Sequence, residues 1–109
     1  MRLSDFRDLL LTIGPPVHHY FAKSQKDSFM VWAEDAESGA SFGDDKKREQ
    51  AIQGTLDYFT KTEFDVTVEK IQNTLNDAEI SWYLSSIQHE KDTGYIHYEW
   101  VFSFVWELI

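Results

Sequence analysis

The sequence of 109 residues contains no cysteine, which excludes disulfide bonds, thiolate metal sites and a thiol nucleophile. No apolar run approaches the roughly 20 residues that a membrane-spanning helix needs. Asp5 and Asp8 interrupt the first residues, so we expect no signal peptide there. Positive charge is also scarce, because ten Lys and Arg stand against nineteen Asp and Glu, for a net charge of −9. Since binding to a phosphate backbone depends on a surplus of cations, this balance argues against a sequence-specific or general nucleic-acid binder.

Aromatic side chains, in contrast, are abundant. The chain has four Trp, five Tyr and eight Phe, and 42% of its residues are hydrophobic. Such a composition favours a folded protein over a disordered one despite the charge. The length suits one hydrophobic core. We therefore expect a single domain over residues 1–109, in a reducing compartment.

Apolar periodicity predicts two helices. In the first, the apolar side chains recur after three and four residues: Phe6, Leu9, Leu10 and Ile13. Ser4 is its expected N-cap and Gly14 its end. The second helix is expected after Thr62 or Asp65, with Phe64 packed against its first turn, and it closes at 76–77. Its apolar stripe consists of Val68, Ile71 and Leu75.

Strands are predicted at 17–23, 29–34 and 50–61. The third shows the clearest alternation, with Ile52, Gly54, Leu56 and Tyr58 on one face. Residues 34–49 carry many charges, two glycines and one large apolar side chain, Phe42. We expect a long mobile loop there, of the kind that is usually functional or disordered.

The C-terminal third predicts a long β-hairpin. Residues 80–85 and 95–108 both alternate, and Asp92-Thr93-Gly94 suits a three-residue loop with glycine in the left-handed position. If Lys91 faces Tyr95, Leu84 faces Phe102 and Trp82 faces Phe104, which keeps the apolar residues together. A hairpin of this length has to bend at a bulge or project beyond the body.

These elements give the order α-β-β-β-α-β-β. The expected fold class is α+β, an antiparallel sheet with the helices packed on one face and a long C-terminal hairpin. No internal repeat or low-complexity segment interrupts this order.

Few residues suggest chemistry. The predicted register places His89 opposite His97, with Glu99 on the same face, which is a conceivable transition-metal site, but a solvated sheet face is the preferred interpretation. Asp57 and Glu99 are the best pair for general acid and base catalysis, again with a solvated face preferred. The glycines at 39 and 43 do not form a phosphate-binding loop, since no Lys-Ser/Thr ending follows them. We expect no enzyme activity, no metal and no cofactor.

Two features suggest contacts between subunits. The stripe from Ile96 to Leu108 holds more large apolar side chains than two short helices comfortably cover, so part of it is expected at an interface. The charged loop provides acids followed by bases, which can fix the register between copies. The candidate interface residues are Phe42, Asp44, Asp45, Lys46, Lys47, Arg48, Trp106 and Leu108.

Three stretches resemble the tail-completion proteins, or tail terminators, of long-tailed phages and prophages. They are 30–34 (MVWAE), 50–61 (QAIQGTLDYFTK) and 92–100 (DTGYIHYEW). The resemblance covers nearly the whole chain, and the family carries no catalytic signature. It implies a minor tail protein of the virion, assembled in the host cytoplasm. Its partners would be copies of itself in a ring, commonly six-fold, the major tail tube protein and a head-completion protein.

Two alternatives stay open. A head–tail connector or stopper would bind the portal side of the same joint. A small acidic inhibitor or immunity protein would use its negative charge to capture a basic enzyme, although the acids here are spread along the chain and interleaved with lysines.

Overall fold

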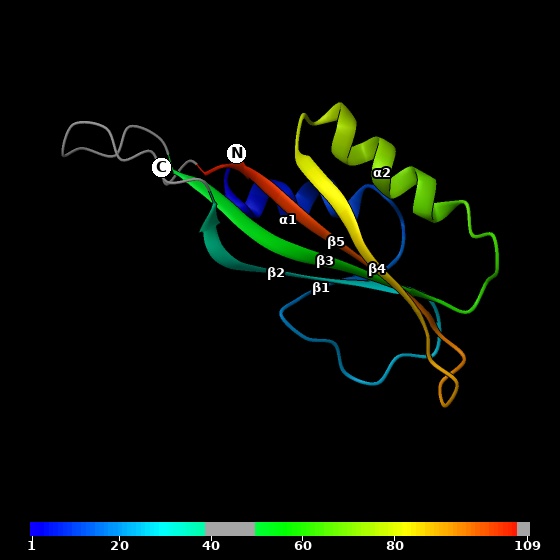
Figure 1. The fold of residues 1–109 in the computed structure, drawn as a ribbon. Coiled ribbons are helices and arrows are strands. Elements are labelled where there is room, and N and C mark those ends of the chain that lie inside the picture. The colour runs from blue at the N-terminus through cyan, green and yellow to red at the C-terminus, as the bar shows by residue number, and fades with distance from the viewer. Residues whose placement is uncertain (39–49, 107–109) are drawn as a thin grey trace.

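The structure is a computed structural model and describes residues 1–38 and 50–106. It contains the predicted order of elements (Figure 1). The elements are α1 (Leu3–Leu11), β1 (Val17–His19), β2 (Phe29–Ser38), β3 (Ala51–Thr60), α2 (Thr67–Asp77), β4 (Ser81–His89) and β5 (Ile96–Val105). The α+β fold class is confirmed. The described residues span 51 × 24 × 24 Å, so the molecule is elongated along its strands.

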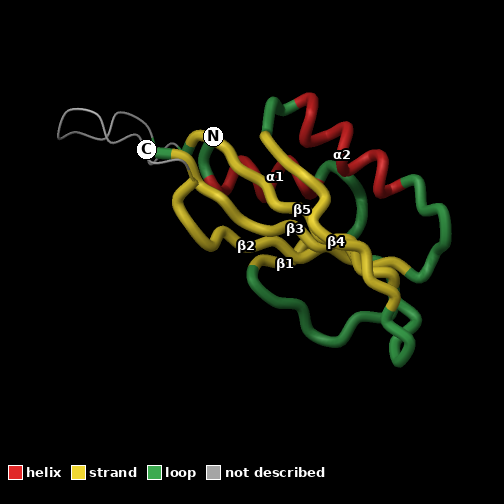
Figure 2. The backbone as a smooth tube through the Cα atoms, in the orientation of Figure 1, coloured by secondary structure: helices red, strands yellow, loops and turns green. Residues whose placement is uncertain are grey.

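The five strands form one sheet with the order β1-β2-β3-β5-β4. All neighbours are antiparallel except β1 and β2, which are parallel. The prediction of a wholly antiparallel sheet is therefore wrong at this edge. The two strands are parallel because the connection 20–28 returns below the sheet to the end where β1 began, and β2 starts there (Figure 2). The Tyr95 hydroxyl holds this connection by donating hydrogen bonds to the carbonyls of Gln25 and Asp27.

Both helices cover one face of the sheet, as expected. The Phe6 ring of α1 lies 4.4 Å from Phe102 and 5.3 Å from Trp32, measured between ring centroids. The indole of Trp100 donates a hydrogen bond to Gln72 of α2. These sheet residues share one side of their strands. We call the other side the open face, since no helix of the described residues covers it.

The local signals at the helix ends were only partly correct. Helix α1 begins at Leu3, one residue before the predicted cap Ser4, and Asp5 accepts the Arg2 N–H at 2.9 Å. Helix α2 has Val66 at its N-cap position, one residue after the predicted cap Asp65, and the Asp65 carboxylate accepts the Thr67 N–H. Phe64 is exposed and does not pack against that turn, so this expectation was wrong.

A buried hydrogen-bond network fixes the start of α2 on the sheet. The hydroxyls of Tyr58 and Thr60 both donate to the Asp65 carboxylate, at 2.6 and 2.7 Å. These bonds lower the pKa of Asp65 against the opposing effect of burial. Burial and the bond to Asp65 raise the pKa of Tyr58. Because each polar group here has a partner, the network holds the helix in place and leaves no reactive group.

The hairpin forms, but its register differs from the prediction. Trp82 pairs with Phe102 and Leu84 with Trp100, not with the partners two residues further on. The turn has four residues, from Lys91 to Gly94, because Glu90 and Tyr95 close it by a backbone hydrogen bond. Gly94 adopts the expected left-handed conformation, with φ of 78°. Of the two ways to accommodate the hairpin, the structure uses a bulge, which leaves Ser85 without a ladder partner.

The aromatic stripe of β5 is covered more fully than the sequence suggested. Trp100 and Phe102 are fully buried and Phe104 nearly so. Strand β5 lies between β3 and β4, so α1 reaches Phe102 and Phe104 while α2 reaches Trp100. The expectation that this described part of the stripe needs a second copy for cover was therefore wrong. The reason is that β5 is an inner strand, and α1 and α2 cover different parts of it.

Candidate functional site

Most of the predicted interface residues lie outside the described part of the chain. This applies to Phe42, Asp44, Asp45, Lys46, Lys47, Arg48 and Leu108. The predicted loop at 34–49 begins later than expected, because β2 continues to Ser38 past a bulge that leaves out Asp35. Trp106 lies within the described residues. It is partly buried against the core, and its backbone N–H donates to the Gln50 carbonyl. Its place at an interface stays a prediction.

On the open face, His97 is the centre of a compact polar cluster. Its Nε2 lies 2.7 Å from Asp57 Oδ1, and its Nδ1 lies 3.7 Å from Glu90 Oε2. The Phe59 ring stacks on the imidazole at 4.1 Å. The hydrogen bond to Asp57 raises the pKa of His97; burial opposes the shift, and the charges of Asp57, Glu90 and Glu99 add to it. The cluster therefore ties the hairpin tip to β3 by a charge-assisted hydrogen bond.

Two chemical hypotheses concern this face: a metal site at His89, His97 and Glu99, and an acid–base pair of Asp57 and Glu99. His89 pairs with Ile96 and not with His97, so the predicted His89–His97 pair was wrong. The error comes from the turn, which has four residues where three were predicted. Within residues 1–38 and 50–106, no group of three or more His, Asp or Glu side chains is arranged to hold a metal ion. Asp57 and Glu99 do lie opposite each other on β3 and β5, but Asp57 is bonded to His97.

The His97 cluster predicts a specific pH dependence of stability. The folded pKa lies above the usual value of 6.5, so protonated His97 stabilises the fold below about pH 6.5. This contribution is lost as the pH rises through the raised pKa. We expect the free energy of unfolding of the wild type to fall from about pH 6 to pH 8.5 relative to His97→Gln, as measured by urea denaturation. His89→Gln on the same hairpin is the control and should follow the wild type; parallel curves for wild type and His97→Gln would contradict the assignment.

The β1 edge carries a second cluster, which the sequence analysis missed. The His19 ring is stacked between Trp32 and Tyr20, with centroid distances of 3.9 and 3.8 Å. Glu34 accepts hydrogen bonds from the Tyr20 hydroxyl and from His19, the latter at 2.8 Å. These bonds lower the pKa of Glu34 against the effect of burial. Tyr20 has a φ of 72°, an uncommon conformation for a side chain of this size.

This stack presents aromatic surface at the edge of the sheet. Tyr20 is 58% exposed and Phe21 is 73% exposed. A strained backbone is retained only where its surroundings enforce it. Here the Tyr20 hydroxyl donates to Glu34, and the Tyr20 backbone N–H donates to the Trp32 carbonyl. The β1 edge therefore exposes two aromatic rings, of which the Tyr20 ring is held by the stack on His19 and by Glu34.

The opposite edge of the sheet is β4, and no strand of the described residues pairs with its outer side. Natural proteins usually protect such an edge with charges, prolines or short length. Strand β4 has nine residues and contains no Asp, Glu, Lys, Arg or Pro. Tyr83 is 60% exposed and Ile87 50% exposed on this strand, and Leu84 is also exposed. The bulge at Ser85 places Tyr83 toward the open face and Ile87 toward the helix side, so both sides of this edge are apolar.

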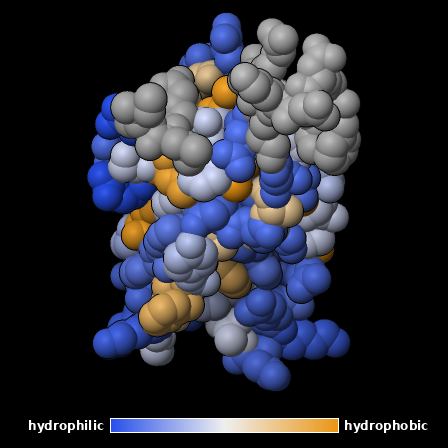
Figure 3. Space-filling model, turned by 90° about the vertical axis from the view of Figure 1, so that its left-hand side faces the viewer, coloured by the Kyte–Doolittle hydropathy of each residue, from blue (hydrophilic) through white to orange (hydrophobic). Residues whose placement is uncertain are grey.

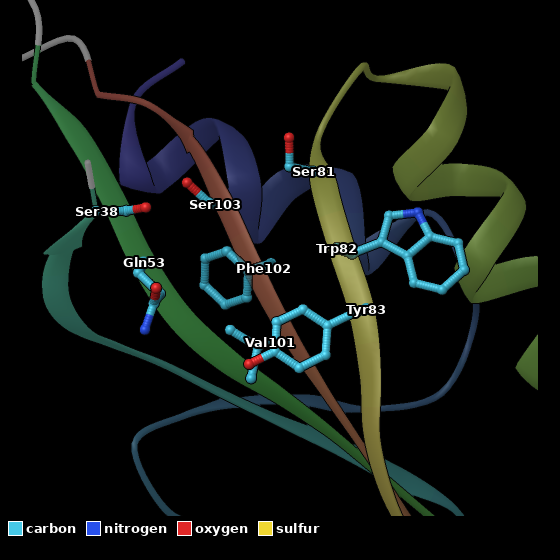
Figure 4. A pocket seen from close by; sticks show the side chains of 8 residues that line it. All are labelled: Ser38, Gln53, Ser81, Trp82, Tyr83, Val101, Phe102 and Ser103. Atoms are coloured by element: carbon cyan, nitrogen blue, oxygen red, sulfur yellow. The ribbon is translucent and has the colours of Figure 1, made fainter.

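A recess of about 340 Å³ adjoins the β4 edge on the open face (Figure 4). Its walls are side chains of Tyr83, Val101 and Gln53, together with hydroxyls of serines on three strands. Phe102 and Trp82 contribute to its floor, while their rings face α1 and α2. The lining has no charged group, which fits a neutral partner surface better than an ionic ligand.

One end of the molecule contrasts with these edges. Seen from the end where β3 begins and β5 ends, it is mainly hydrophilic, with separate hydrophobic residues (Figure 3). No helix of the described residues has the length and apolar character needed to cross a membrane. Neither protein-family models nor curated protein sequences give a match to the chain. Exposed apolar side chains also precede α2, at Phe64 and Val66. The two apolar edges suit protein–protein contact.

Proposed function

We propose that the protein is a non-enzymatic structural subunit that completes a phage tail, forming a ring on the end of the tail tube and joining it to the head. The observation that carries the proposal is the β4 edge, with nine uncharged residues and exposed Tyr83, Leu84 and Ile87. An edge of this kind is a template for pairing with another chain. A subunit that acts alone would have reason to protect it.

Two further findings support the same function. The order of elements, α-β-β-β-α-β-β, is similar to that of tail terminators. The stretches 30–34, 50–61 and 92–100 resemble the same family. In the conspicuous polar clusters, His97 bonds to Asp57, and His19 and Tyr20 bond to Glu34. Their chemistry ties segments together, which is the role expected in a structural protein.

Mixing the purified chain with tubes of the major tail protein from the same genome tests this function. We expect density bound at tube ends in negatively stained images, and a larger assembly than the monomer. Shearing the tubes provides the control, because fresh ends should gain bound chain in proportion while the tube sides stay bare. A protein that stays monomeric and leaves every tube end bare would contradict the proposal.

Parallel mixtures with the portal-side ring and with a basic protein separate the alternatives. A connector of the head side would bind the portal-side ring in place of the tube end. An acidic inhibitor would form a one-to-one complex with a basic protein and ignore both surfaces. Binding to the tube end therefore selects tail completion among the three.

A further inference from the structure

His97 lies between two carboxylates that face its two ring nitrogens. Its Nε2 lies 2.7 Å from Asp57 Oδ1 on β3, and its Nδ1 lies 3.7 Å from Oε2 of Glu90, which directly follows β4. An imidazole carries hydrogen on both nitrogens only in its protonated form. Only the imidazolium therefore directs an N–H toward both carboxylates, so the two contacts together depend on one proton.

The charges around the imidazole favour that proton. They come from three places: Asp57 on β3, Glu90 after β4 and Glu99 on β5. The hydrogen bond to Asp57 raises the pKa of His97, burial lowers it, and the three charges raise it further. A cation of the segment after β3, Lys61, lies over the Tyr95 ring, 4.8 Å from its centroid. The imidazolium therefore persists above pH 6.5, the usual pKa of histidine.

Loss of the proton affects the two contacts unequally. The remaining hydrogen stays on Nε2, because the bond to Asp57 is the shorter one and the Asp57 side chain is only 19% exposed. Nδ1 then turns a lone pair toward the Glu90 carboxylate, which can only accept. The Glu90 side chain is 36% exposed, so it can move into water. Deprotonation therefore keeps the Asp57 contact and releases Glu90.

Glu90 belongs to a turn that has its own hydrogen bonds. The Glu90 N–H donates to the Tyr95 carbonyl, and the Gly94 N–H donates to the Glu90 carbonyl. The Thr93 hydroxyl donates to Oε1 of Glu90 at 3.1 Å, the oxygen that does not face His97. None of these bonds needs the imidazolium. The turn 90–95 therefore keeps its shape after the release and moves as a unit.

The same turn holds the connection 20–28, which runs below the sheet (Figure 2). The Tyr95 hydroxyl donates to the carbonyls of Gln25 and Asp27, at 2.9 and 3.1 Å. The Tyr95 ring is buried and meets Phe29 and Phe59 edge to face. A movement of the turn therefore displaces the group that fixes the connection.

We infer that the turn 90–95 is a pH-dependent latch on the connection 20–28. Protonated His97 holds the latch against β3 through Glu90. When the imidazole loses its proton, the latch loosens, and the connection that Tyr95 clasps loosens with it. The latch is independent of tail completion, because all of its contacts lie within one copy of the chain.

Two methyl groups report the motion without exchanging with water: that of Thr93 in the turn and that of Ala22 in the connection. Their order parameters, from carbon relaxation between about pH 5.5 and 9, test the latch. We expect both to fall by roughly a third as the His97 ring, followed in the same samples through its carbon shifts, loses its proton. The methyls of Val31 in β2 are the internal reference and should not change.

Glu90→Gln is the decisive variant. It removes the charge that the imidazolium holds, and the amide introduced there can donate to the unprotonated Nδ1. Both methyls should then stay ordered throughout the His97 titration. Asp92→Asn is the matched control, because it removes the same charge from the same turn and Asp92 is not among the charges that act on His97. It should respond to pH like the wild type.

Tyr95→Phe separates the turn from the connection. It removes the hydroxyl that bonds to Gln25 and Asp27, so Ala22 should be mobile at every pH while Thr93 keeps its dependence on His97. Circular dichroism at both ends of the pH range establishes that the variants fold. Wild-type methyls that do not follow the His97 titration, or a Glu90→Gln variant that responds like the wild type, would overturn the latch. Motion of Thr93 without Ala22 in the wild type would overturn its hold on the connection.

Discussion

Replacing Phe6 with alanine is expected to lower the free energy of unfolding by about 3–5 kcal/mol. Phe6 is fully buried, and its ring contacts those of Trp32, Phe102 and Phe104, at centroid distances of 5.3, 4.4 and 5.3 Å. Truncation removes the apolar side chain that joins α1 to both β2 and β5, and it leaves a cavity beneath the helix. Urea denaturation followed by tryptophan fluorescence measures the loss.

Helix α1 also supplies the control for this substitution. Leu11 lies on the same helix but is exposed, so Leu11→Ala should change stability by no more than about 0.5 kcal/mol. A loss of less than about 1 kcal/mol for Phe6→Ala would show that α1 is not an integral layer of the core. Since a domain of this size is stable by only about 5–15 kcal/mol, the expected loss brings Phe6→Ala close to unfolding.

The regular parts of the fold were predictable because they depend on local periodicity. Strand β3 alternates between buried and partly buried residues from Ala51 to Thr60, as its sequence indicates. Gly94 takes the left-handed position that a hairpin turn requires. The face of α1 that carries Phe6 and Leu10 is the buried one. In each case, the information lies within a few neighbouring residues.

The errors arose where the structure depends on contacts distant in sequence. The direction of β1 follows from the return of 20–28 across the open face, and nothing in the segment itself encodes it. The four-residue turn and the bulge at Ser85 each shift the hairpin register by one residue, although the predicted register also keeps the apolar residues together. Helix coverage of β5 depends on its inner position between β3 and β4, which the chain order does not reveal.

The candidate site shows the same division. The bonds of Glu34 to His19 and Tyr20 connect two strands through a parallel pairing that was not foreseen, so the stack at the β1 edge could not be predicted. The lack of charge in strand β4 is visible in the sequence, but its position at an outer edge depends on the order of the sheet.

Gly54, on the central strand β3, is important for the packing of the sheet. Gly54 lies on β3, opposite Glu34 on one side and Phe102 on the other. A Cβ added there would overlap the Ala33 carbonyl oxygen and lie 2.7 Å from Phe102 Cζ. The oxygen belongs to the backbone of β2 and cannot rotate away, so the strands themselves would have to separate.

Gly54→Ala is therefore expected to destabilise the protein by about 3 kcal/mol, at the upper end of the range for overpacked cores. Gly94→Ala is the contrasting variant, because a Cβ at that position meets no atom within 4 Å and costs only the left-handed conformation, about 1–2 kcal/mol. Urea denaturation of both variants compares a steric with a conformational cost. If Gly54→Ala proved as stable as the wild type, β2 and β3 would have to lie further apart at Ala33 than their ladder implies, and the placement of the β1 edge beyond them would need revision.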